Sequence, residues 1–379
     1  MIDEFLEVVG FYHFLLFVTS AVICIFLIYL ARYLPMLTGG RRMLSAIQAS
    51  HVDPTPRVGG IAIFASLFVA ALIAPIEMSS EYLVFMMAAC VLFVVGLIED
   101  LTGKVSPRMR LLAAAGASCV VIFILDIWMP RIGIPPLDWV ASYAILGIPI
   151  TLLITVGMAN GFNLIDGVNG LASFSAMVAA AALAVISYQA GYDSMSMIAS
   201  FLFVSVLGFF IFNFPFGKIF LGDAGAYTIG FVLSWCAIAI VINAPQASPW
   251  ALLLTLFWPV ADTCLAITRR MRKQTATTAP DRLHFHHLVM RALEIVLLGR
   301  NRRPISNSLS TIILAPFILT PALAGIAFWD SNRLAFIAVL GFSVLFGGLY
   351  VLAFPILRKI KRAERHLARQ DMRSSSKST

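Results

Sequence analysis

Long apolar stretches alternate with short polar connections along almost the whole chain. A helix needs roughly 20 apolar residues to cross the hydrocarbon core of a bilayer, and about eleven stretches approach that length. The pattern therefore predicts an all-α, polytopic integral membrane protein with about eleven transmembrane helices. The expected spans cover residues 10–31, 58–75, 81–98, 110–127, 140–158, 170–189, 195–213, 224–242, 249–267, 309–328 and 333–354.

The clearest interruption of this pattern is NGFNLIDGVNG at residues 160–170, which separates two apolar stretches. Glycine and asparagine tolerate tight turns, so the segment is predicted to be a polar turn between two spans. Asn163, Asp166 and Asn169 recur at every third residue, and their oxygens would suit a hard cation or the hydroxyls of a sugar. The same residue types also cap helices, and both interpretations are open at this point.

Composition and charge give the membrane protein an orientation. Of 379 residues, 60% are hydrophobic and only 12% charged, whereas a soluble domain has roughly a quarter charged residues. By the predicted topology, 25 of the 27 Lys and Arg residues fall on one side, which the positive-inside rule assigns to the cytoplasm. The N-terminus is then expected outside and the C-terminus in the cytoplasm.

The chain is predicted to hold one functional domain and a tail. Residues 1–357 form a single transmembrane catalytic domain with its site on the cytoplasmic loops. Residues 358–379 form a basic cytoplasmic tail that is expected to be disordered, because its end is poor in apolar residues. The basic composition of the tail suits the anionic inner leaflet.

Carboxylates stand at the cytoplasmic ends of several spans. Glu99 and Asp100 close the third span, Asp166 closes the fifth, Asp223 opens the eighth, and Asp262 lies near the inner end of the ninth. Grouped carboxylates repel one another unless a cation neutralises them. Oxygen donors favour Mg2+, with Mn2+ as an alternative, and Mg2+ bound to carboxylates usually works on phosphates.

Basic residues and histidines accompany these acids. Cationic side chains beside carboxylates are what phosphoryl transfer requires, although the positive-inside rule alone accounts for most of them. The pair Gly59 and Gly60 after Arg57 could let a bare backbone approach a ligand. The segment PDRLHFHHLVMR at residues 280–291 contains three histidines, which could bind a diphosphate or exchange protons near neutral pH.

Five motifs occur in order from about Asp53 to Leu288: DPTPRVGG, GLIEDLTGKVSPRMRLL, NGFNLIDGVNGLA, FNFPFGKIFLGDAG and PDRLHFHHL. This set resembles the polyprenyl-phosphate N-acetylhexosamine-1-phosphate transferases of glycosyltransferase family 4, with phospho-MurNAc-pentapeptide translocase as a more distant relative. The resemblance implies Mg2+-dependent transfer of a HexNAc-1-phosphate from a UDP-HexNAc to undecaprenyl phosphate. The products would be undecaprenyl-diphospho-sugar and UMP, at the start of O-antigen or other cell-surface polysaccharide synthesis.

The resemblance also assigns residues. The expected catalytic residues are Glu99, Asp100, Asp166 and Asp223, and Asp166 and Asp223 are the expected metal ligands. The expected substrate-binding residues are Asp53, Arg57, Gly59, Gly60, Lys104, Arg108, Asn163, Asn213, Lys218, His284, His286 and His287.

The sequence departs from the family pattern at three positions. Glu99 stands where the family has Asp, Asn169 where many members have Asp, and Ala226 where Ser is common. These changes leave the donor sugar open: GlcNAc is the default, and a deoxy-aminosugar such as QuiNAc or FucNAc is an alternative.

The resemblance implies a bacterial inner (cytoplasmic) membrane enzyme surrounded by lipid, able to form a homodimer and without a nucleic-acid partner.

A transporter or flippase is an alternative function, since acidic residues within membrane spans often take part in ion movement, but here the acids lie at the cytoplasmic rim. Another is a CDP-alcohol phosphotransferase, whose DGxxAR motif is missing after Asp166.

Overall fold

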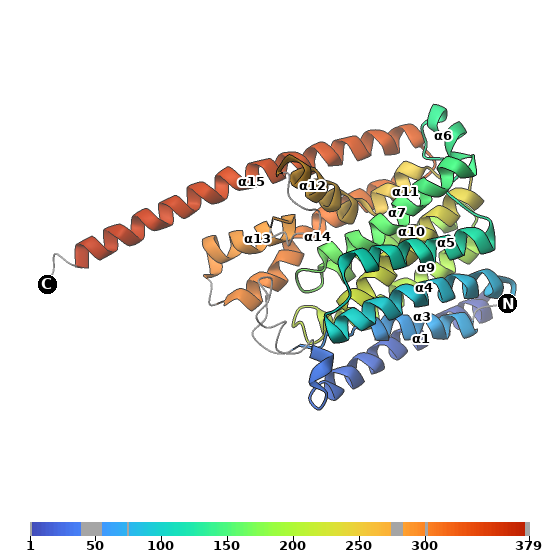
Figure 1. The fold of residues 1–379 in the computed structure, drawn as a ribbon, viewed down its shortest axis with the longest axis horizontal. Coiled ribbons are helices and arrows are strands. Elements are labelled where there is room, and N and C mark those ends of the chain that lie inside the picture. The colour runs from blue at the N-terminus through green and yellow to red at the C-terminus, as the bar shows by residue number, and fades with distance from the viewer. Residues whose placement is uncertain (1, 39–54, 74–75, 274–282, 300–301, 376–379) are drawn as a thin grey trace.

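The protein is a bundle of helices, seen here in a computed structural model that describes residues 2–38, 55–73, 76–273, 283–299 and 302–375 (Figure 1). Every regular element in these ranges is helical. The elements are α1 (Ile2–Leu30), η1 (Pro35–Thr38), α3 (Gly60–Ile73), α4 (Ile76–Thr102), α5 (Pro107–Leu125), α6 (Pro135–Ala141), α7 (Ala144–Ile165), α8 (Leu171–Gln189), α9 (Asp193–Asn213), α10 (Gly222–Asn243), α11 (Pro249–Thr255), α12 (Phe257–Lys273), α13 (Phe285–Leu293), η2 (Glu294–Leu298), α14 (Arg303–Ala327) and α15 (Asn332–Ser375).

The expected all-α, multi-pass membrane fold is confirmed, and two of the expected spans take another form. Within the described residues, nine helices are long and apolar enough to cross a membrane. The span expected at 249–267 is instead the pair α11 and α12, bent by 85°. Pro259 lies in the first turn of α12, where its missing N–H is tolerated. The span expected at 58–75 is α3, whose 14 residues reach only about 21 Å at 1.5 Å per residue.

Helix α10 is the core of the bundle. Of its most apolar window, 89% is buried inside the protein, compared with 61% for α8 and less for the other spans. Small residues allow this close packing: a Cβ at Gly60 of α3 would lie 2.6 Å from Gly225 Cα of α10. The ends of α10 are therefore fixed by the helices around it.

A short backbone ladder fastens the segment before α3 to the segment before α10. Phe220 N–H donates to Pro56 O at 2.8 Å, and Gly59 N–H donates to Phe220 O at 2.9 Å. Gly60 N–H donates to Leu221 O, also at 2.9 Å. The ladder places Arg57 beside the first turn of α10.

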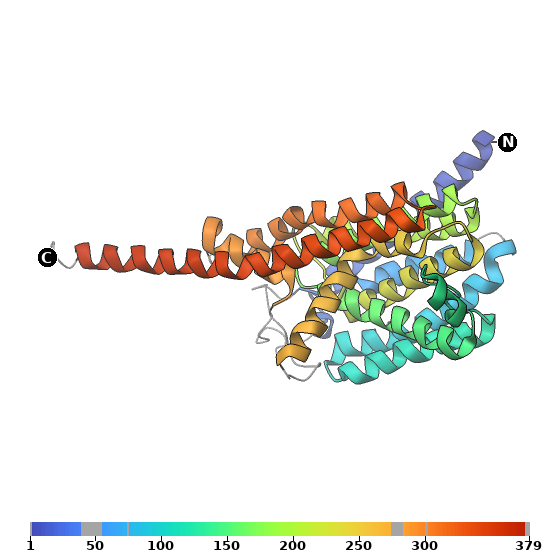
Figure 2. The ribbon, with the colours of Figure 1, turned by 90° about the horizontal axis from the view of Figure 1, so that it is seen from above.

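Helix α15 differs from the expected tail. It continues without interruption to Ser375 and projects beyond the bundle (Figures 1 and 2). The sequence predicted disorder after residue 357, but Lys, Arg, Glu, Ala and Leu dominate residues 358–370 and are all strong helix formers. The correction concerns residues 358–375, the part of the tail that the structure describes.

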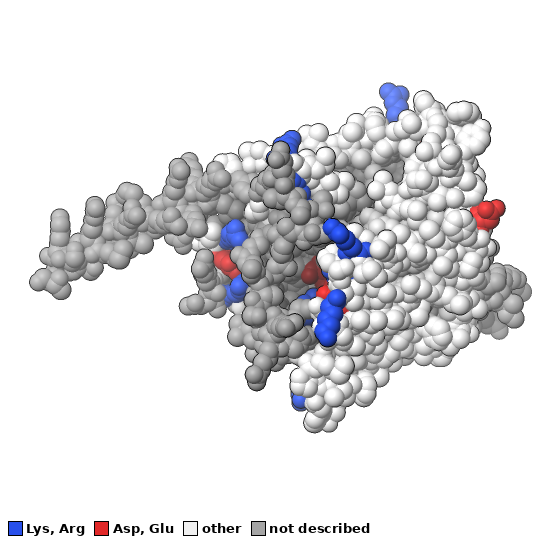
Figure 3. Space-filling view, in the orientation of Figure 1, with Lys and Arg blue, Asp and Glu red and all other residues white. Residues whose placement is uncertain are grey.

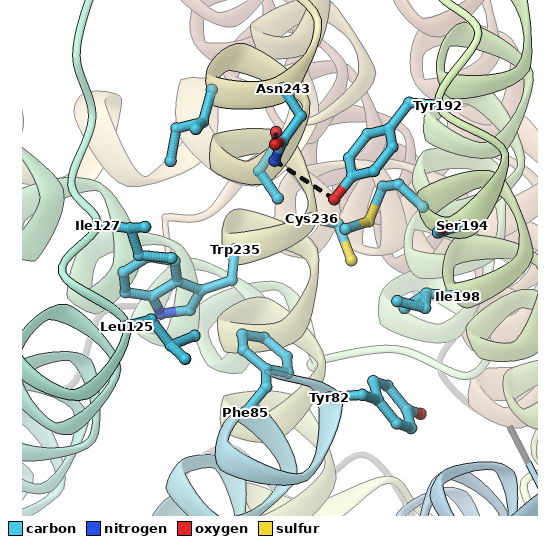
Figure 4. A pocket seen from close by; sticks show the side chains of 13 residues that line it. Tyr82, Phe85, Leu125, Ile127, Tyr192, Ser194, Ile198, Trp235, Cys236 and Asn243 are labelled. Atoms are coloured by element: carbon cyan, nitrogen blue, oxygen red, sulfur yellow. Dashed lines mark hydrogen bonds between the residues drawn. The ribbon is translucent and has the colours of Figure 1, made fainter. Parts of the chain in front are cut away.

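Charged side chains and an apolar-lined cavity lie in different regions of the bundle. The flank of the bundle is mostly uncharged, and charged side chains gather near the end from which α15 projects (Figure 3). A cavity of about 400 Å³ lies toward the opposite end, among residues such as Phe85, Leu125, Tyr192, Trp235 and Asn243 (Figure 4). Its lining contains no carboxylate and no histidine, so the polar chemistry belongs to the other end of the bundle.

Candidate active site

The first turn of α10 is held by a carboxylate from the end of α4. Asp223 N–H donates to Asp100 Oδ1 at 2.8 Å, and Ala224 N–H donates to Asp100 Oδ2 at 2.9 Å. Asp100 is only 1% exposed. A negative charge at a helix N-terminus is stabilised by the unpaired N–H groups and the helix dipole. Asp100 therefore fixes the position of Asp223.

Gly222 makes this arrangement possible. Its backbone is left-handed, with φ +74°, which glycine adopts without strain. A Cβ at this position would overlap the Arg57 carbonyl oxygen and lie 2.6 Å from Asp100 Oδ2. The chain can bring Arg57, Asp100 and Asp223 together only if residue 222 has no side chain.

The Asp223 carboxylate meets two helices. Asn163 Nδ2, in the last turn of α7, donates to Asp223 Oδ1 at 3.0 Å. Arg110 of α5 forms an ion pair with Asp223 Oδ2, and its guanidinium carbon lies 5.7 Å from the ring centroid of Tyr227. Besides this ion pair, the buried Oδ2 makes no hydrogen bond with the residues that the structure describes. Arg110 is absent from the sequence-predicted site, because no local spacing links it to an acid on a distant helix.

Asp166 lies directly after α7, on the turn predicted from NGFNLIDGVNG. Burial raises the pKa of its carboxyl from 3.8 to about 6, although the Arg57 charge and the Gly222 N–H both act to lower it. Arg57 also interacts electrostatically with Asp100. The carboxylates at the end of α4 and directly after α7 therefore share one cationic side chain, Arg57.

The raised pKa of Asp166 predicts a pH-dependent gain in stability for Asp166→Asn. Because the folded pKa lies above the unfolded value, ionised Asp166 opposes folding above pH 6, and this cost disappears as the pH falls toward 4. The difference between 3.8 and about 6 corresponds to at most about 3 kcal/mol. In EDTA, thermal unfolding should show the variant more stable than the wild type at pH 7.5, with the gap narrowing toward pH 5. A more stable wild type at pH 7.5, or a constant gap, would contradict the assignment.

The histidine segment lies against this turn. A Cβ at Gly167 would overlap His286 Nε2 and lie 3.0 Å from His287 Cε1. The His286 ring is fully buried, and neither of its nitrogens is hydrogen-bonded to the described residues. Burial, together with His287 and His284, lowers the pKa of His286 well below its ordinary value. His286 is therefore neutral at pH 7.

His284 has a carboxylate partner that sequence reasoning did not assign to it. His284 Nδ1 and Asp262 Oδ2 are 2.6 Å apart, and both side chains are buried. Asp262 was identified in the sequence as a membrane-edge acid, but the bend between α11 and α12, which the sequence analysis did not predict, is what aims it at α13.

Several residues that the sequence predicted to bind a ligand have contacts within the fold. Asn213 accepts hydrogen bonds from Gly170 N–H and Ser173 Oγ and donates to Ile219 O. Gly59 and Gly60 are buried against protein, so the expected open backbone after Arg57 is occupied by helix packing.

Asn169 does not share the side of Asn163. Its N–H donates to Asn307 Oδ1 of α14 at 2.6 Å, and its Nδ2 donates to Pro215 O at 3.2 Å. The turn therefore separates the three regularly spaced residues, with Asn163 facing Asp223 and Asn169 anchoring α14.

The remaining predicted residues lie around the same end of the bundle. Glu99 is partly exposed, and its Oε2 accepts from Val105 N–H at 2.6 Å. The side chains of Lys104, Arg108 and Lys218 are exposed and form no ion pair with the described residues. Asp53 lies outside the described residues.

Several known proteins are similar in sequence to this chain over most of its length. Residues 82–241 match the family model for glycosyl transferase family 4. The chain is 30% identical to a decaprenyl-phosphate N-acetylglucosaminephosphotransferase of Mycolicibacterium smegmatis, over 82% of this chain and 80% of the relative. It is 27% identical to an undecaprenyl-phosphate alpha-N-acetylglucosaminyl 1-phosphate transferase of Yersinia pestis, over 84% and 86%. A probable undecaprenyl-phosphate N-acetylglucosaminyl 1-phosphate transferase of Bacillus subtilis is 27% identical over 63% and 67%.

The apolar helices, the buried acids at one end and these similarities define a multi-pass membrane enzyme, a phosphotransferase. The chain belongs to glycosyl transferase family 4. The family resemblance drawn from the five ordered motifs is thereby confirmed.

Proposed function

We propose that the protein transfers a HexNAc-1-phosphate, GlcNAc-1-phosphate by default, from a UDP-HexNAc to undecaprenyl phosphate. The phosphate of the lipid attacks the β-phosphorus of the donor, the bond from that phosphorus to the bridging oxygen breaks, and UMP leaves. Relatives named for transfer of N-acetylglucosaminyl 1-phosphate to undecaprenyl phosphate support the acceptor and the transferred group. The lipid product would initiate O-antigen or another cell-surface polysaccharide at the cytoplasmic face of a bacterial inner membrane.

The arrangement around Asp223 carries this proposal. Its carboxylate stands at the N-terminus of a buried helix, between Asn163 and Arg110, and Asp166 and Arg57 lie near the same turn. Fixed charges and N–H groups of this kind stabilise the charge that develops during phosphoryl transfer, and they need no rearrangement to do so.

Asp223 and Asp166 fit the proposed Mg2+. No three His, Cys, Asp or Glu side chains converge as a metal-binding group within the described residues, but Mg2+ bound to phosphates commonly uses only one or two carboxylates. Asp223 Oδ2 is a buried anionic oxygen that pairs with the Arg110 cation, and carboxylate oxygens of this kind are ligands that Mg2+ uses. When bound, Mg2+ would neutralise charge on the donor diphosphate, and Asp223 and Asp166 would hold it.

The protein residues contribute mainly electrostatics and position. A phosphate nucleophile is already mostly ionised at pH 7, because its second pKa is about 6, so it needs little help from a base. Both carboxylate oxygens of Asp100 accept hydrogen bonds from N–H groups of α10, and the role of Asp100 is to hold Asp223 in place. Arg57 and the exposed Lys104, Arg108 and Lys218 supply positive charge for the phosphates of donor and acceptor.

The test uses the purified full chain in detergent with UDP-GlcNAc and undecaprenyl phosphate. We expect UMP release that requires the lipid phosphate, stops in EDTA and returns with Mg2+. Parallel reactions with UDP-QuiNAc and UDP-FucNAc identify the donor. Lipid-independent UMP release, or no release with any of the three donors, would overturn the proposal. Movement of an intact lipid-linked sugar across vesicles without UMP release would indicate a flippase.

A further inference from the structure

The backbone on both sides of His284 is anchored. On one side, Leu283 O accepts hydrogen bonds from Arg269 Nη1 at 3.2 Å and from Tyr350 Oη at 3.1 Å. On the other side, Phe285 N–H donates to Asp262 Oδ1 at 3.1 Å. The anchors come from α12 and α15, so helices distant in sequence fix the main chain of this one histidine.

An aromatic cluster keeps the same segment from sliding. The Phe285 ring packs against Trp258, Phe346 and Tyr350, with centroid distances of 5.6, 5.2 and 6.2 Å. Aromatic pairs at these separations add to the stabilisation from buried area. Because His284 precedes Phe285 directly, its backbone has little freedom to move.

The side chain of His284 is fixed as well. Its Nδ1 is 2.6 Å from Asp262 Oδ2, and the two residues are 4% and 1% exposed. An ionised carboxylate only accepts hydrogen bonds, so Nδ1 must carry the proton in this pair. His284 makes no other hydrogen bond to the described residues, which leaves Nε2 available to a ligand.

We infer that Asp262 is a positioning residue for the transfer reaction: it fixes the tautomer and orientation of His284, so that Nε2 faces the phosphate-bearing donor. The inference rests on the proposed function, because that function supplies the donor. Carboxylates that hold a histidine in this way also stabilise positive charge on the ring when it binds an anion. Asp262 itself touches no reacting atom, and no bond to it forms or breaks.

The Asp262→Asn substitution changes the contact that positions the His284 ring and keeps the contact that anchors the backbone at Phe285. The asparagine oxygen can still accept from Phe285 N–H, so the segment keeps its backbone anchor. The asparagine amide replaces Oδ2 and would donate to Nδ1, which moves the ring proton to Nε2. We expect kcat to fall by about 10- to 100-fold, as for other carboxylates that orient a histidine. KM for UDP-GlcNAc should change little, because the backbone site is kept.

The decisive measurement is a double-mutant cycle with His284→Ala. If Asp262 acts through His284, adding Asp262→Asn to His284→Ala should lower kcat no further. Independent, additive losses would overturn the inference. So would an Asp262→Asn enzyme with normal kcat and only a lower melting temperature.

Ser118→Ala is the matched control for the loss of a buried polar interaction. Ser118 hydrogen-bonds Thr155 at 2.7 Å, between α5 and α7 and away from the histidines. We expect this variant to lose stability and keep its kcat, and it calibrates how much a purely structural defect affects turnover. A wild-type protein without transferase activity would refute the proposed function before any variant is compared, so the two failures are distinguishable.

Discussion

Asp223→Asn should lower kcat by about 100- to 1,000-fold, the range seen when one group that stabilises transition-state charge is removed. The substitution replaces Oδ2, the partner of the Arg110 guanidinium, with an amide that cannot balance the charge of Arg110. Asn163 can still donate to the remaining oxygen, so the first turn of α10 should persist. The initial rate of UMP release at saturating donor and lipid phosphate measures the effect.

Two further variants separate the lost chemistry from a folding defect. Asp193→Asn makes the same change at an exposed acid in the first turn of α9, at the opposite end of the bundle, and should keep its activity. Adding Arg110→Gln to Asp223→Asn removes the cation left without its partner and should recover stability without recovering turnover. Near-normal kcat for Asp223→Asn would show that Asp223 is not part of the catalytic machinery.

Gly222→Ala should reduce activity by at least about 100-fold, because a displacement of about 1 Å at a catalytic group can cost that much. The new Cβ overlaps the Arg57 carbonyl oxygen and crowds Asp100 Oδ2, so the loop before α3, the end of α4 and the start of α10 cannot all keep their positions. The residue must also remain left-handed, which costs an alanine roughly 1–2 kcal/mol. Both the melting temperature and UMP release should fall.

Gly191→Ala provides the matched control. Gly191 has the same φ of +74°, but a Cβ there meets nothing within 4 Å. The two variants share the backbone strain and differ in the clash alone. Equal activities of Gly191→Ala and Gly222→Ala would show that the contact with Arg57 and Asp100 does not matter for function.

The sequence predicted the residues that lie on short polar segments between spans. Asp166 stands on a turn that glycines and asparagines mark, Asn163 lies in the helical turn just before it, and Asp223 opens a strongly apolar helix, so local pattern alone identifies them. Their expected position at one common face of the membrane followed from the distribution of Lys and Arg. The helical membrane fold followed from the length of the apolar stretches.

The residues that the sequence did not reveal depend on contacts between distant helices. Arg110 looks like any cation of a cytoplasmic loop until α5 and α10 are packed side by side. Asp262 reaches His284 only because α12 leaves α11 at 85°. Gly59, Gly60 and Asn213 are residue types that are common in ligand-binding loops. Only the packed structure shows that other parts of the protein contact them.

The anchoring of His284 by Tyr350 has a consequence for biogenesis. Tyr350 lies in α15, whereas Asp100, Asp166 and Asp223 lie in spans or turns made much earlier. During synthesis the acidic half of the site can assemble while the histidine half has its contacts with α12 but still lacks the one from α15. A nascent chain therefore cannot acquire the complete site before α15 has entered the membrane, and truncation before α15 should leave an inserted but inactive protein.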